Sequence, residues 1–371
     1  MRITYIFFTC LCLLSLIACE KEEAEPSPRR TVLIYIAGDN NLSSNAYTNI
    51  QWIEEGLEKD GLDNGNLLVY IDTRSESPRL FRITVENGVA LQTDVEVFEE
   101  DAHSSASPET LTYILDKVIR EYPADGYGLV LWSHGTAWLP SDTRSYLRSF
   151  GQDGNDFIEL NELASALSPF HFDFLLFDAC YMASTEVFYA LRERADYLIG
   201  SPTEILGNGF PYSSFMGKMF ADEVDAVGIA TEFYNYYKNS AGTVSVVKSD
   251  ELDALAETCR EIFQTKTEEE LFAVPVSELQ IMEHLTSQYH ALYDLDDYIS
   301  RLATAGQYEA FRQALDKAVI YKANTPRSYY ANGGYIAIDR FSGLSIYVPQ
   351  AELPKLNEWY EDLEWYRYVY P

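Results

Sequence analysis

The sequence predicts an α/β fold built on a mainly parallel sheet, with a smaller subdomain at its C-terminal end. Two observations lead to this class. In the first two thirds of the chain, short apolar runs rich in Val, Ile, Leu and Tyr alternate with segments of helical periodicity, which is typical of buried parallel strands joined by helices. Beyond Gly242 this alternation changes to mostly helical sequence.

The first predicted elements are a strand, a helix, a second strand and a hairpin. Residues 31–39 (TVLIYIAGD) and 66–72 (NLLVYID) are apolar, β-rich runs, and residues 43–59 between them have helical periodicity. Residues 80–98 alternate apolar and polar side chains around an Asn-Gly pair at 87–88. This pair between two alternating segments is a strong signal for a tight hairpin.

A capped helix and further strands follow. Ser107 and Pro108 predict a helix start, with serine as the N-cap and proline in the first turn. Further strands are expected at residues 127–133 (YGLVLWS), 172–178 (FDFLLFD), 196–201 (DYLIGS) and 243–248 (TVSVVK), with a helical segment near 159–167. Residues 250–318 are predicted to be mostly helical, and residues 335–349 (YIAIDRFSGLSIYVP) to form a hairpin.

These patterns divide the chain into a main domain at residues 31–249 and a C-terminal subdomain of helices and a hairpin at 250–371, packed on the first. The 371 residues are 47% hydrophobic, which is ample for a sizeable core. The formal net charge is −31, from 58 acidic and 27 basic side chains. This charge argues against a nucleic-acid partner, whose phosphates must be neutralised by Lys and Arg, and would attract cationic peptides.

The N-terminus predicts an exported lipoprotein. Residues 1–18 are expected to be a signal peptide, because their apolar stretch is short for a membrane span and follows Arg2. The sequence LIAC that ends at Cys19 resembles a lipobox, whose cysteine is diacylated and becomes the mature N-terminus. Residues 19–30 (CEKEEAEPSPRR) are then a flexible tether. The alternative is an ordinary signal peptide with a chance cysteine.

The tether also carries a location signal. Its lysine among acidic residues resembles the sequence that sends some bacterial lipoproteins to the cell surface. The expected location is therefore the cell envelope, anchored to the outer membrane by lipid and facing either the periplasm or the exterior. Of the five cysteines, only Cys180 and Cys259 remain beyond this region, so the protein is not a disulfide scaffold. The sequence leaves open whether these two pair.

Reactive residues follow two of the predicted parallel strands. Ligands of open α/β sheets bind outside the carboxyl ends of the strands. His134 follows one strand and Cys180 the next, 180 − 134 = 46 residues later, which leaves room for one crossover helix. Alone, such a cysteine is most often a small buried hydrophobe and a His-Gly pair a loop. Together, they predict a thiol nucleophile with a histidine that moves its proton.

Neighbouring residues fit this chemistry. Gly135 has no Cβ, so its N–H can approach a substrate oxygen and form an oxyanion hole with the N–H of Cys180. His171 is a poorer partner, because it begins the strand that Cys180 follows and must lie at the opposite edge. Asp178 either caps the next helix or places a negative charge at the floor of a pocket for a cationic side chain. A buried carboxylate is costly unless paired, and a substrate Arg or Lys would pair it.

Several motifs resemble the clostripain family of cysteine peptidases, relatives of gingipains, legumains and caspases. They are TVLIYIAGDNNL, WSHG, FDACYM followed by Glu186, ADYLIGSPTEILGNGFPY, YDLDDY and GLSIYVP, in the family's order over nearly the whole mature chain. The resemblance implies a caspase-like α/β/α sandwich and a catalytic dyad of His134 and Cys180. It also implies that Asp178 supports a preference for Arg or Lys before the scissile bond.

The resemblance carries two further expectations. Family members often cleave themselves between the histidine and cysteine strands, and residues 136–156 offer Arg144 and Arg148 as basic candidates. Clostripain is associated with calcium, although the peptidase chemistry needs no metal. Residues 153–156 (DGND) form an acidic turn, but their spacing is not that of an EF-hand loop and suits a solvated surface equally well.

Two segments depart from the family pattern. Tyr181-Met182-Ala183-Ser184 follows the cysteine where relatives commonly have Leu-Met-Gly, and SPTEILGNGFPY is a looser copy of the family's loop. Both flank the expected pocket, so they bear on substrate preference more than on catalysis.

Two functions remain compatible with the sequence. The first is a lipid-anchored endopeptidase that cleaves proteins or peptides after Arg or Lys. The second is a catalytically inactive relative that binds peptide or glycan at the surface. The presence of His134, Gly135 and Cys180 together favours the enzyme. A serine hydrolase is disfavoured, because the sequence has no G-x-S-x-G motif.

Overall fold

The computed structural model of the chain describes residues 27–99, 103–140, 149–285, 289–330 and 333–370. Three residues singled out above, Cys19, Arg144 and Arg148, lie outside these ranges, as do the expected signal peptide and most of the tether. No helix within the described ranges has the length and apolar character needed to cross a membrane.

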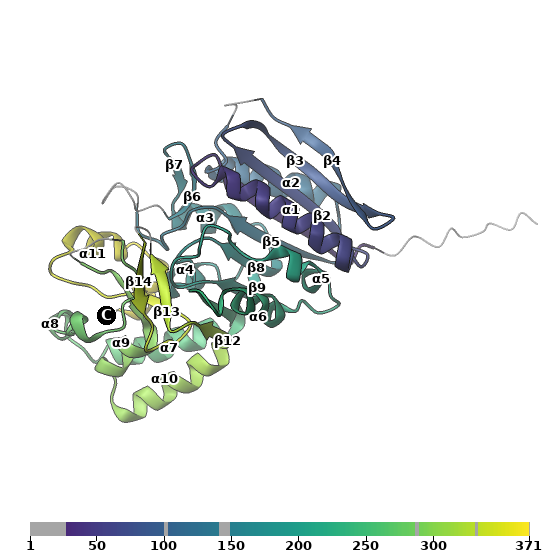
Figure 1. The fold of residues 1–371 in the computed structure, drawn as a ribbon. Coiled ribbons are helices and arrows are strands. Elements are labelled where there is room, and N and C mark those ends of the chain that lie inside the picture. Colours follow the sequence, from purple (N-terminus) through teal and green to yellow (C-terminus); the bar gives the residue numbers. More distant parts are fainter. Residues whose placement is uncertain (1–26, 100–102, 141–148, 286–288, 331–332, 371) are drawn as a thin grey trace, which may run out of the picture.

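A nine-stranded sheet forms the centre of the molecule, in the order β12-β10-β9-β8-β5-β1-β2-β3-β4 (Figure 1). Its central strands pair in parallel and its outer strands pair antiparallel, which confirms the α/β class with a mainly parallel core. The parallel strands are β1 (Arg30–Gly38), β2 (Asn66–Thr73), β5 (Gly126–Trp132), β8 (Phe172–Asp178) and β9 (Ala195–Gly200). The outer strands are β3 (Glu76–Glu86), β4 (Val89–Val97), β10 (Thr243–Lys248) and β12 (Val319–Asn324).

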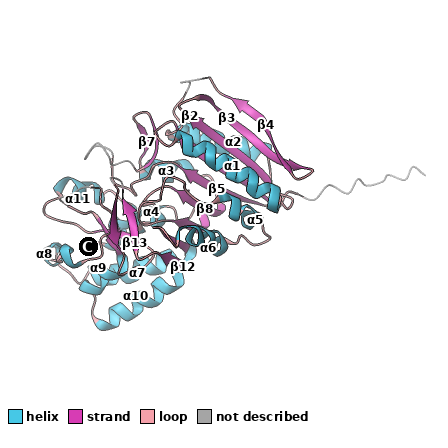
Figure 2. Cartoon of the chain, in the orientation of Figure 1, coloured by secondary structure: helices cyan, strands magenta, loops and turns pink. Residues whose placement is uncertain are grey.

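Helices cover both faces of the sheet, so the fold is the expected α/β/α sandwich (Figure 2). One face is covered by α1 (Ser43–Asp60), α5 (Met216–Met219) and α6 (Ala226–Tyr237). The other face is covered by α2 (Pro108–Glu121), α3 (Leu160–Leu167), α4 (Thr185–Ala190) and α7 (Leu252–Phe263). Because both faces are covered, β1 is buried along its whole length, with Ile34 packed on one side and Tyr35 on the other.

Local sequence signals act as predicted in two elements. The chain turns between β3 and β4 at Asn87 and Gly88, whose φ angles of 54° and 80° are those that a type I′ hairpin turn requires. At the start of α2, the Ser107 side chain accepts a hydrogen bond from the backbone N–H of Thr110 at 3.1 Å.

The hairpin predicted at residues 335–349 is wrong. Its first half is β14 (Gly334–Ala337), which pairs with β13 (Arg327–Tyr330). Its second half is β15 (Ser345–Tyr347), which pairs with β11 (Leu292–Asp294). The turn between the halves is instead held by the buried carboxylate of Asp294, which accepts a hydrogen bond from the N–H of Ser342 at 2.5 Å. A local alternation predicts strands but not their partners.

The C-terminal part is mostly helical, yet it also completes the main sheet. β12 comes from residues 319–324 and pairs with β10, so the segment expected as a packed subdomain supplies an edge strand. The remaining elements are the short β6 (Phe150–Asp153) and β7 (Asp156–Ile158), and the helices α8 (Glu268–Phe272), α9 (Leu295–Leu302), α10 (Ala305–Ala318), α11 (Pro354–Tyr360) and α12 (Glu364–Val369).

Candidate active site

His134 and Cys180 leave the sheet side by side. In the parallel pairing of β5 with β8, Trp132 stands opposite Asp178, and each candidate follows two residues later. The two chain segments remain in contact beyond the strands. Ser133 donates its backbone N–H to the carbonyl of Asp178 at 3.3 Å, and a Cβ added to Gly135 would lie only 2.7 Å from the carbonyl oxygen of Cys180. The sheet therefore brings the histidine and the thiol to one edge.

The loop that carries His134 is fixed by hydrogen bonds to neighbouring strands. Ser133 donates its hydroxyl to the carbonyl of Ala37 at 2.6 Å and accepts the N–H of Gln152 at 3.1 Å. The carbonyl of His134 accepts the N–H of Gly151 at 3.0 Å. Gly135 stands opposite Phe150 of β6 in an antiparallel bridge. The hydrogen bonds of this bridge are made by His134 and Thr136, so they do not use the N–H of Gly135.

The imidazole has a partner that the sequence did not reveal. Nε2 of half-buried His134 lies 2.8 Å from Oδ1 of Asn41. Asn41 follows β1, the neighbour of β5, so the same strand-end rule could have identified it. An amide oxygen at this distance can accept a hydrogen bond from the Nε2–H of the imidazole and so hold the ring in one orientation.

Cys180 is half-buried, and its sulfur contacts the segment that follows β9. The N–H of Ile205 donates to Sγ at 3.3 Å, and the thiol points to the carbonyl of Ile205 at 3.6 Å. Burial of the sulfur, followed by the charge of Glu204, raises the pKa of the thiol to about 12, although the Ile205 N–H opposes this shift. In this arrangement the thiol is therefore protonated at neutral pH.

The two remaining cysteines do not pair. Cys259 is buried in α7, and both it and Cys180 are free thiols. The disulfide that the sequence left open is thus absent.

Asp178 is buried at the end of β8, and its carboxylate has donors from within the protein. Oδ2 accepts the N–H of Phe210 at 3.0 Å and the hydroxyl of Tyr212 at 2.9 Å. Burial raises the pKa of this carboxyl to about 6, and the two hydrogen bonds oppose the shift. The backbone of Gly209 lies close to this carboxylate, with a φ of 66°. A Cβ at this position would lie only 2.6 Å from Oδ2, so a larger residue would clash.

The interpretation of Asp178 as a helix cap is wrong. Helix α4 is capped by Ser184, whose side chain accepts the N–H of Val187 at 3.3 Å. The cost of burying Asp178 is also offset in part by the hydrogen bonds from Phe210 and Tyr212, which no sequence pattern indicated. Both of these hydrogen bonds are accepted by Oδ2.

Tyr181 and Glu204 form a second feature that the sequence did not reveal. The ring of Tyr181 is buried, and its hydroxyl donates to Oε1 of Glu204 at 2.7 Å. Its φ of 66° is unusual for a residue with a side chain, and its N–H donates to the carbonyl of Thr203 at 3.0 Å. The only sequence signal was that Tyr181 departs from the family pattern.

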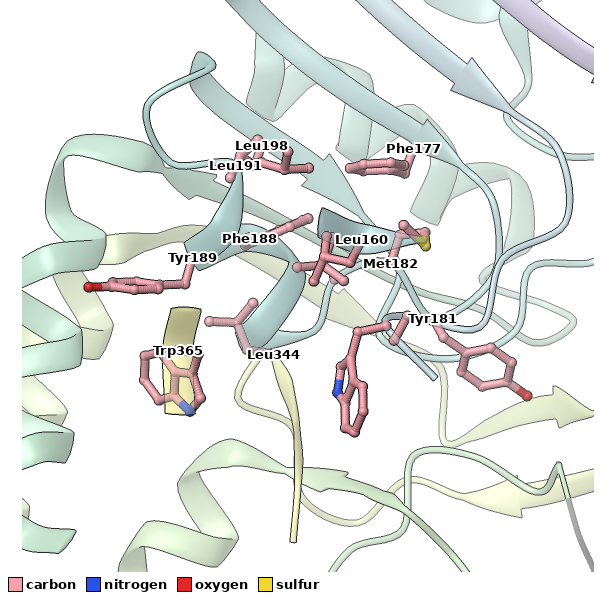
Figure 3. Close-up of a cluster of buried hydrophobic side chains, with 14 of the residues drawn as sticks. Leu160, Phe177, Tyr181, Met182, Phe188, Tyr189, Leu191, Leu198, Leu344 and Trp365 are labelled. Atoms are coloured by element: carbon pink, nitrogen blue, oxygen red, sulfur yellow. The ribbon is translucent and has the colours of Figure 1, made fainter. Parts of the chain in front are cut away.

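Beyond Tyr181 the chain enters the hydrophobic core. Figure 3 shows Met182 and Phe188 within one apolar cluster that also contains Phe177 of β8. The nucleophile candidate is thus held between a buried strand and a buried helix, so its backbone is firmly placed.

The acidic turn considered for calcium lies between β6 and β7. Oδ2 of Asp153 accepts the N–H and the hydroxyl of Ser105, at 2.6 and 3.1 Å. Among the described residues, no group of three or more His, Cys, Asp or Glu side chains is arranged to hold a metal ion. Calcium binding stays a prediction from the resemblance.

The chain is similar to known cysteine peptidases along most of its length. The model of the clostripain family (Peptidase_C11) matches residues 34–370. Clostripain of Hathewaya histolytica is 26% identical over an alignment of 233 residues, and the match covers 54% of this chain and 44% of that protein. The chain thus matches less than half the length of this curated relative.

Solved structures of C11 proteases resemble the whole described fold. An inactive zymogen of a C11 protease from Parabacteroides distasonis is 62% identical, with a TM-score of 0.89 over 93% of this chain and 99% of that one. A secreted C11 cysteine protease from Bacteroides thetaiotaomicron, in complex with an irreversible peptide inhibitor, is 34% identical, with a TM-score of 0.82 over 92% of this chain and 98% of that one.

Proposed function

The chain belongs to the clostripain family of cysteine peptidases, and we propose that it is an endopeptidase that cleaves peptide bonds after Arg or Lys. Cys180 is the nucleophile and His134 the general acid and base. One observation carries this assignment: the register of β5 and β8 places both residues two positions beyond a matched pair at the carboxyl edge of the sheet. Ligands of open α/β sheets bind at this edge.

The proposed reaction begins when the peptide carbonyl lies over Cys180. The sulfur attacks the carbonyl carbon, its proton passes to the imidazole of His134, and the carbonyl oxygen gains negative charge. In this proposal the backbone N–H groups of Gly135 and Cys180 stabilise that oxygen. The imidazolium then gives its proton to the leaving amine, and water releases the acyl group from the thioester.

We further propose that Asp178 selects the basic residue before the cleaved bond. Its carboxylate lies two residues from the nucleophile, and Phe210, Tyr212 and Gly209 surround it from one side. A carboxylate with a pKa of about 6 is mostly ionised at pH 7, so it offers a charge to an incoming cation. A buried charge pair of this kind discriminates strongly against neutral side chains.

Fluorogenic amides that differ only in the residue before the amide bond test this specificity. We expect kcat/KM for Arg- and Lys-amides to exceed that for the Leu-amide by about 100-fold, because the neutral side chain leaves the Asp178 charge unpaired. In the Asp178→Asn variant this preference should fall by at least about tenfold. Equal rates with Arg- and Leu-amides in the wild-type protein would remove the role given to Asp178.

We propose that the protein is a lipoprotein anchored to the outer membrane through Cys19. The first described residues lie at the amino edge of the sheet, where Arg29 pairs with Asp63 at 2.6 Å and its carbonyl accepts the N–H of Gly126 at 3.0 Å. From Cys19 to Ser27 are 27 − 19 = 8 residues, which span at most about 28 Å. The amino edge of the sheet would therefore face the membrane. The carboxyl edge, which carries Cys180, would point away from the membrane.

Self-processing is expected between Pro140 and Ser149, after Arg144 or Arg148. The similarity to a protein described as an inactive zymogen supports this proposal. Mass spectrometry of the active wild-type protein should show a break after one of the two arginines, and the Cys180→Ala protein should remain a single chain. A fully active protein whose chain is intact in this segment would refute the prediction.

A further inference from the structure

Two acidic residues belong to the segments that carry and contact the sulfur of Cys180, and the charge of each acts on the thiol. Asp178 lies two residues before it on the same strand end. Glu204 precedes Ile205, whose N–H and carbonyl both contact Sγ, at 3.3 and 3.6 Å. The acids thus approach the thiol from β8 and from the segment after β9. Among the described residues, Tyr181 donates its hydroxyl to Glu204, Tyr212 donates its hydroxyl to Asp178, and His134 follows the neighbouring strand. Glu283 and Tyr237 also act electrostatically on this group, through Tyr181 and Asp178 respectively.

The side chain of Glu204 is held in place by a hydrogen bond. Its Oε1 accepts the hydroxyl of Tyr181 at 2.7 Å, and Tyr181 is the residue directly after the nucleophile. The ring of Tyr181 is buried, and its backbone N–H donates to the carbonyl of Thr203. The Tyr181 side chain is therefore firmly positioned, and so is the carboxylate to which it donates. A substitution by glutamine would keep an acceptor for Tyr181 and remove the negative charge.

Both carboxylates act against ionisation of the thiol. A like charge nearby disfavours a thiolate, and the half-buried setting strengthens the effect because water screens it poorly. Besides burial, Glu204 and then Asp178 raise the pKa of Cys180. Before substrate binds, the nucleophile is thus held in its protonated, slow form.

We propose that the cationic side chain of the substrate activates Cys180 by neutralising the carboxylates of Asp178 and Glu204. This inference rests on the proposed preference for Arg or Lys. A guanidinium or ammonium group paired with Asp178 places a positive charge in the region where the two acids repel a thiolate. The cation then favours loss of the thiol proton at the moment when the peptide bond is in place. Substrates with Arg or Lys before the cleaved bond would therefore acylate Cys180 faster than neutral substrates, in addition to binding more tightly.

Alkylation of the thiol by neutral iodoacetamide measures this effect without peptide cleavage. The thiolate attacks the methylene carbon, iodide leaves, and the thiol proton goes to solvent. At pH 7, a saturating concentration of ethylguanidinium should accelerate labelling of Cys180 by about tenfold, which corresponds to a fall of about one unit in its pKa. Ethylurea, which has a similar shape and no charge, should have no effect. Unchanged or slower labelling with ethylguanidinium would overturn the proposal.

Variants separate the two acids from a general effect of surface charge. Glu204→Gln should label about tenfold faster than wild type without any additive and should respond less to ethylguanidinium. Glu223→Gln is the matched control, since Glu223 is exposed and lies near Ala221, which contacts Arg30 at the opposite edge of the sheet. It should label at the wild-type rate. A Glu204→Gln protein that labels no faster than Glu223→Gln would contradict the role of Glu204.

The two proposals can fail separately. If the protein does not prefer Arg- or Lys-amides, the proposed specificity fails and this inference fails with it. If Arg-amides are cleaved preferentially while ethylguanidinium leaves the labelling of Cys180 unchanged, the specificity stands and only the activation by substrate is wrong.

Discussion

Replacement of Cys180 by alanine is expected to abolish peptide hydrolysis, and replacement of His134 by alanine to lower kcat/KM by at least about 1,000-fold. Without the sulfur no acyl-enzyme can form, and without the imidazole neither the thiol nor the leaving amine exchanges its proton efficiently. The losses should not add in the double variant, because the two residues act as a unit. Initial rates with an Arg-amide substrate measure all three proteins.

Cys259→Ala is the matched control for this experiment. Cys259 is the other free thiol among the described residues, and it lies buried in α7 rather than at the carboxyl edge of the sheet. Its removal should leave kcat/KM near the wild-type value. Hydrolysis at the wild-type rate by Cys180→Ala would rule out the assigned nucleophile, whatever the family of the chain.

Replacement of Tyr360 by alanine should lower the free energy of unfolding by about 3–5 kcal/mol. Tyr360 is fully buried at the end of α11, where its ring stacks on Trp138 at 5.4 Å between centroids and meets Tyr347 edge-on at 4.8 Å. Removing the ring leaves a large cavity that the neighbouring aromatic side chains cannot close. Urea denaturation followed by fluorescence gives the difference.

Tyr360→Phe distinguishes the ring from its hydroxyl. The hydroxyl of Tyr360 is buried and makes no hydrogen bond of normal geometry within the described part of the chain, although Glu186 and Tyr370 lie near it. Phenylalanine keeps the stacking and removes a hydroxyl without a well-formed hydrogen bond, so the unfolding free energy should change by less than about 1 kcal/mol. If Tyr360→Phe were as destabilising as Tyr360→Ala, the stability would depend on the hydroxyl and the packing argument would be wrong.

The contacts of Tyr360 with Trp138 and Tyr347 also explain how the C-terminal residues contribute to the site. Trp138 belongs to the loop that follows His134, and the N–H of Tyr347 donates to Glu186 of α4 at 2.7 Å. The tail therefore holds both segments that carry the proposed dyad. Figure 3 shows the same arrangement at Leu344 and Trp365, which pack against the side chains that follow Cys180.

The sequence predicted much of the fold because its signals are local. The buried runs of β1, β5 and β8, the Asn-Gly turn between β3 and β4 and the Ser107 cap each depend on a few adjacent residues. The predicted hairpin at 335–349 failed for the complementary reason. Two adjacent alternating runs indicate strands, but each found a better partner elsewhere in the chain.

The residues of the candidate site also fall into two groups, those that the sequence predicted and those that it did not. The emergence of His134 and Cys180 at neighbouring strand ends was predictable, since the end of a parallel strand can be recognised in the sequence. Asn41, Glu204 and Tyr212 were not identified. Asn41 is hydrogen-bonded to His134, Glu204 to Tyr181, which is the residue after Cys180, and Tyr212 to Asp178. The sequence separations of these hydrogen bonds are 93, 23 and 34 residues, and no local pattern joins their ends.

The amino-acid sequence by itself determined which segments become strands, where those strands end, and hence which reactive side chains emerge at one edge of the sheet. Periodicity and turn chemistry act over a few residues, so they can be identified before any contact is known. Only the tertiary structure decided what surrounds the thiol, from the Ile205 backbone on Sγ to the two acids beside it. Ile205 is 25 residues further along the chain than Cys180, with Glu204 directly before it, and only packing sets how close these two residues lie to the sulfur.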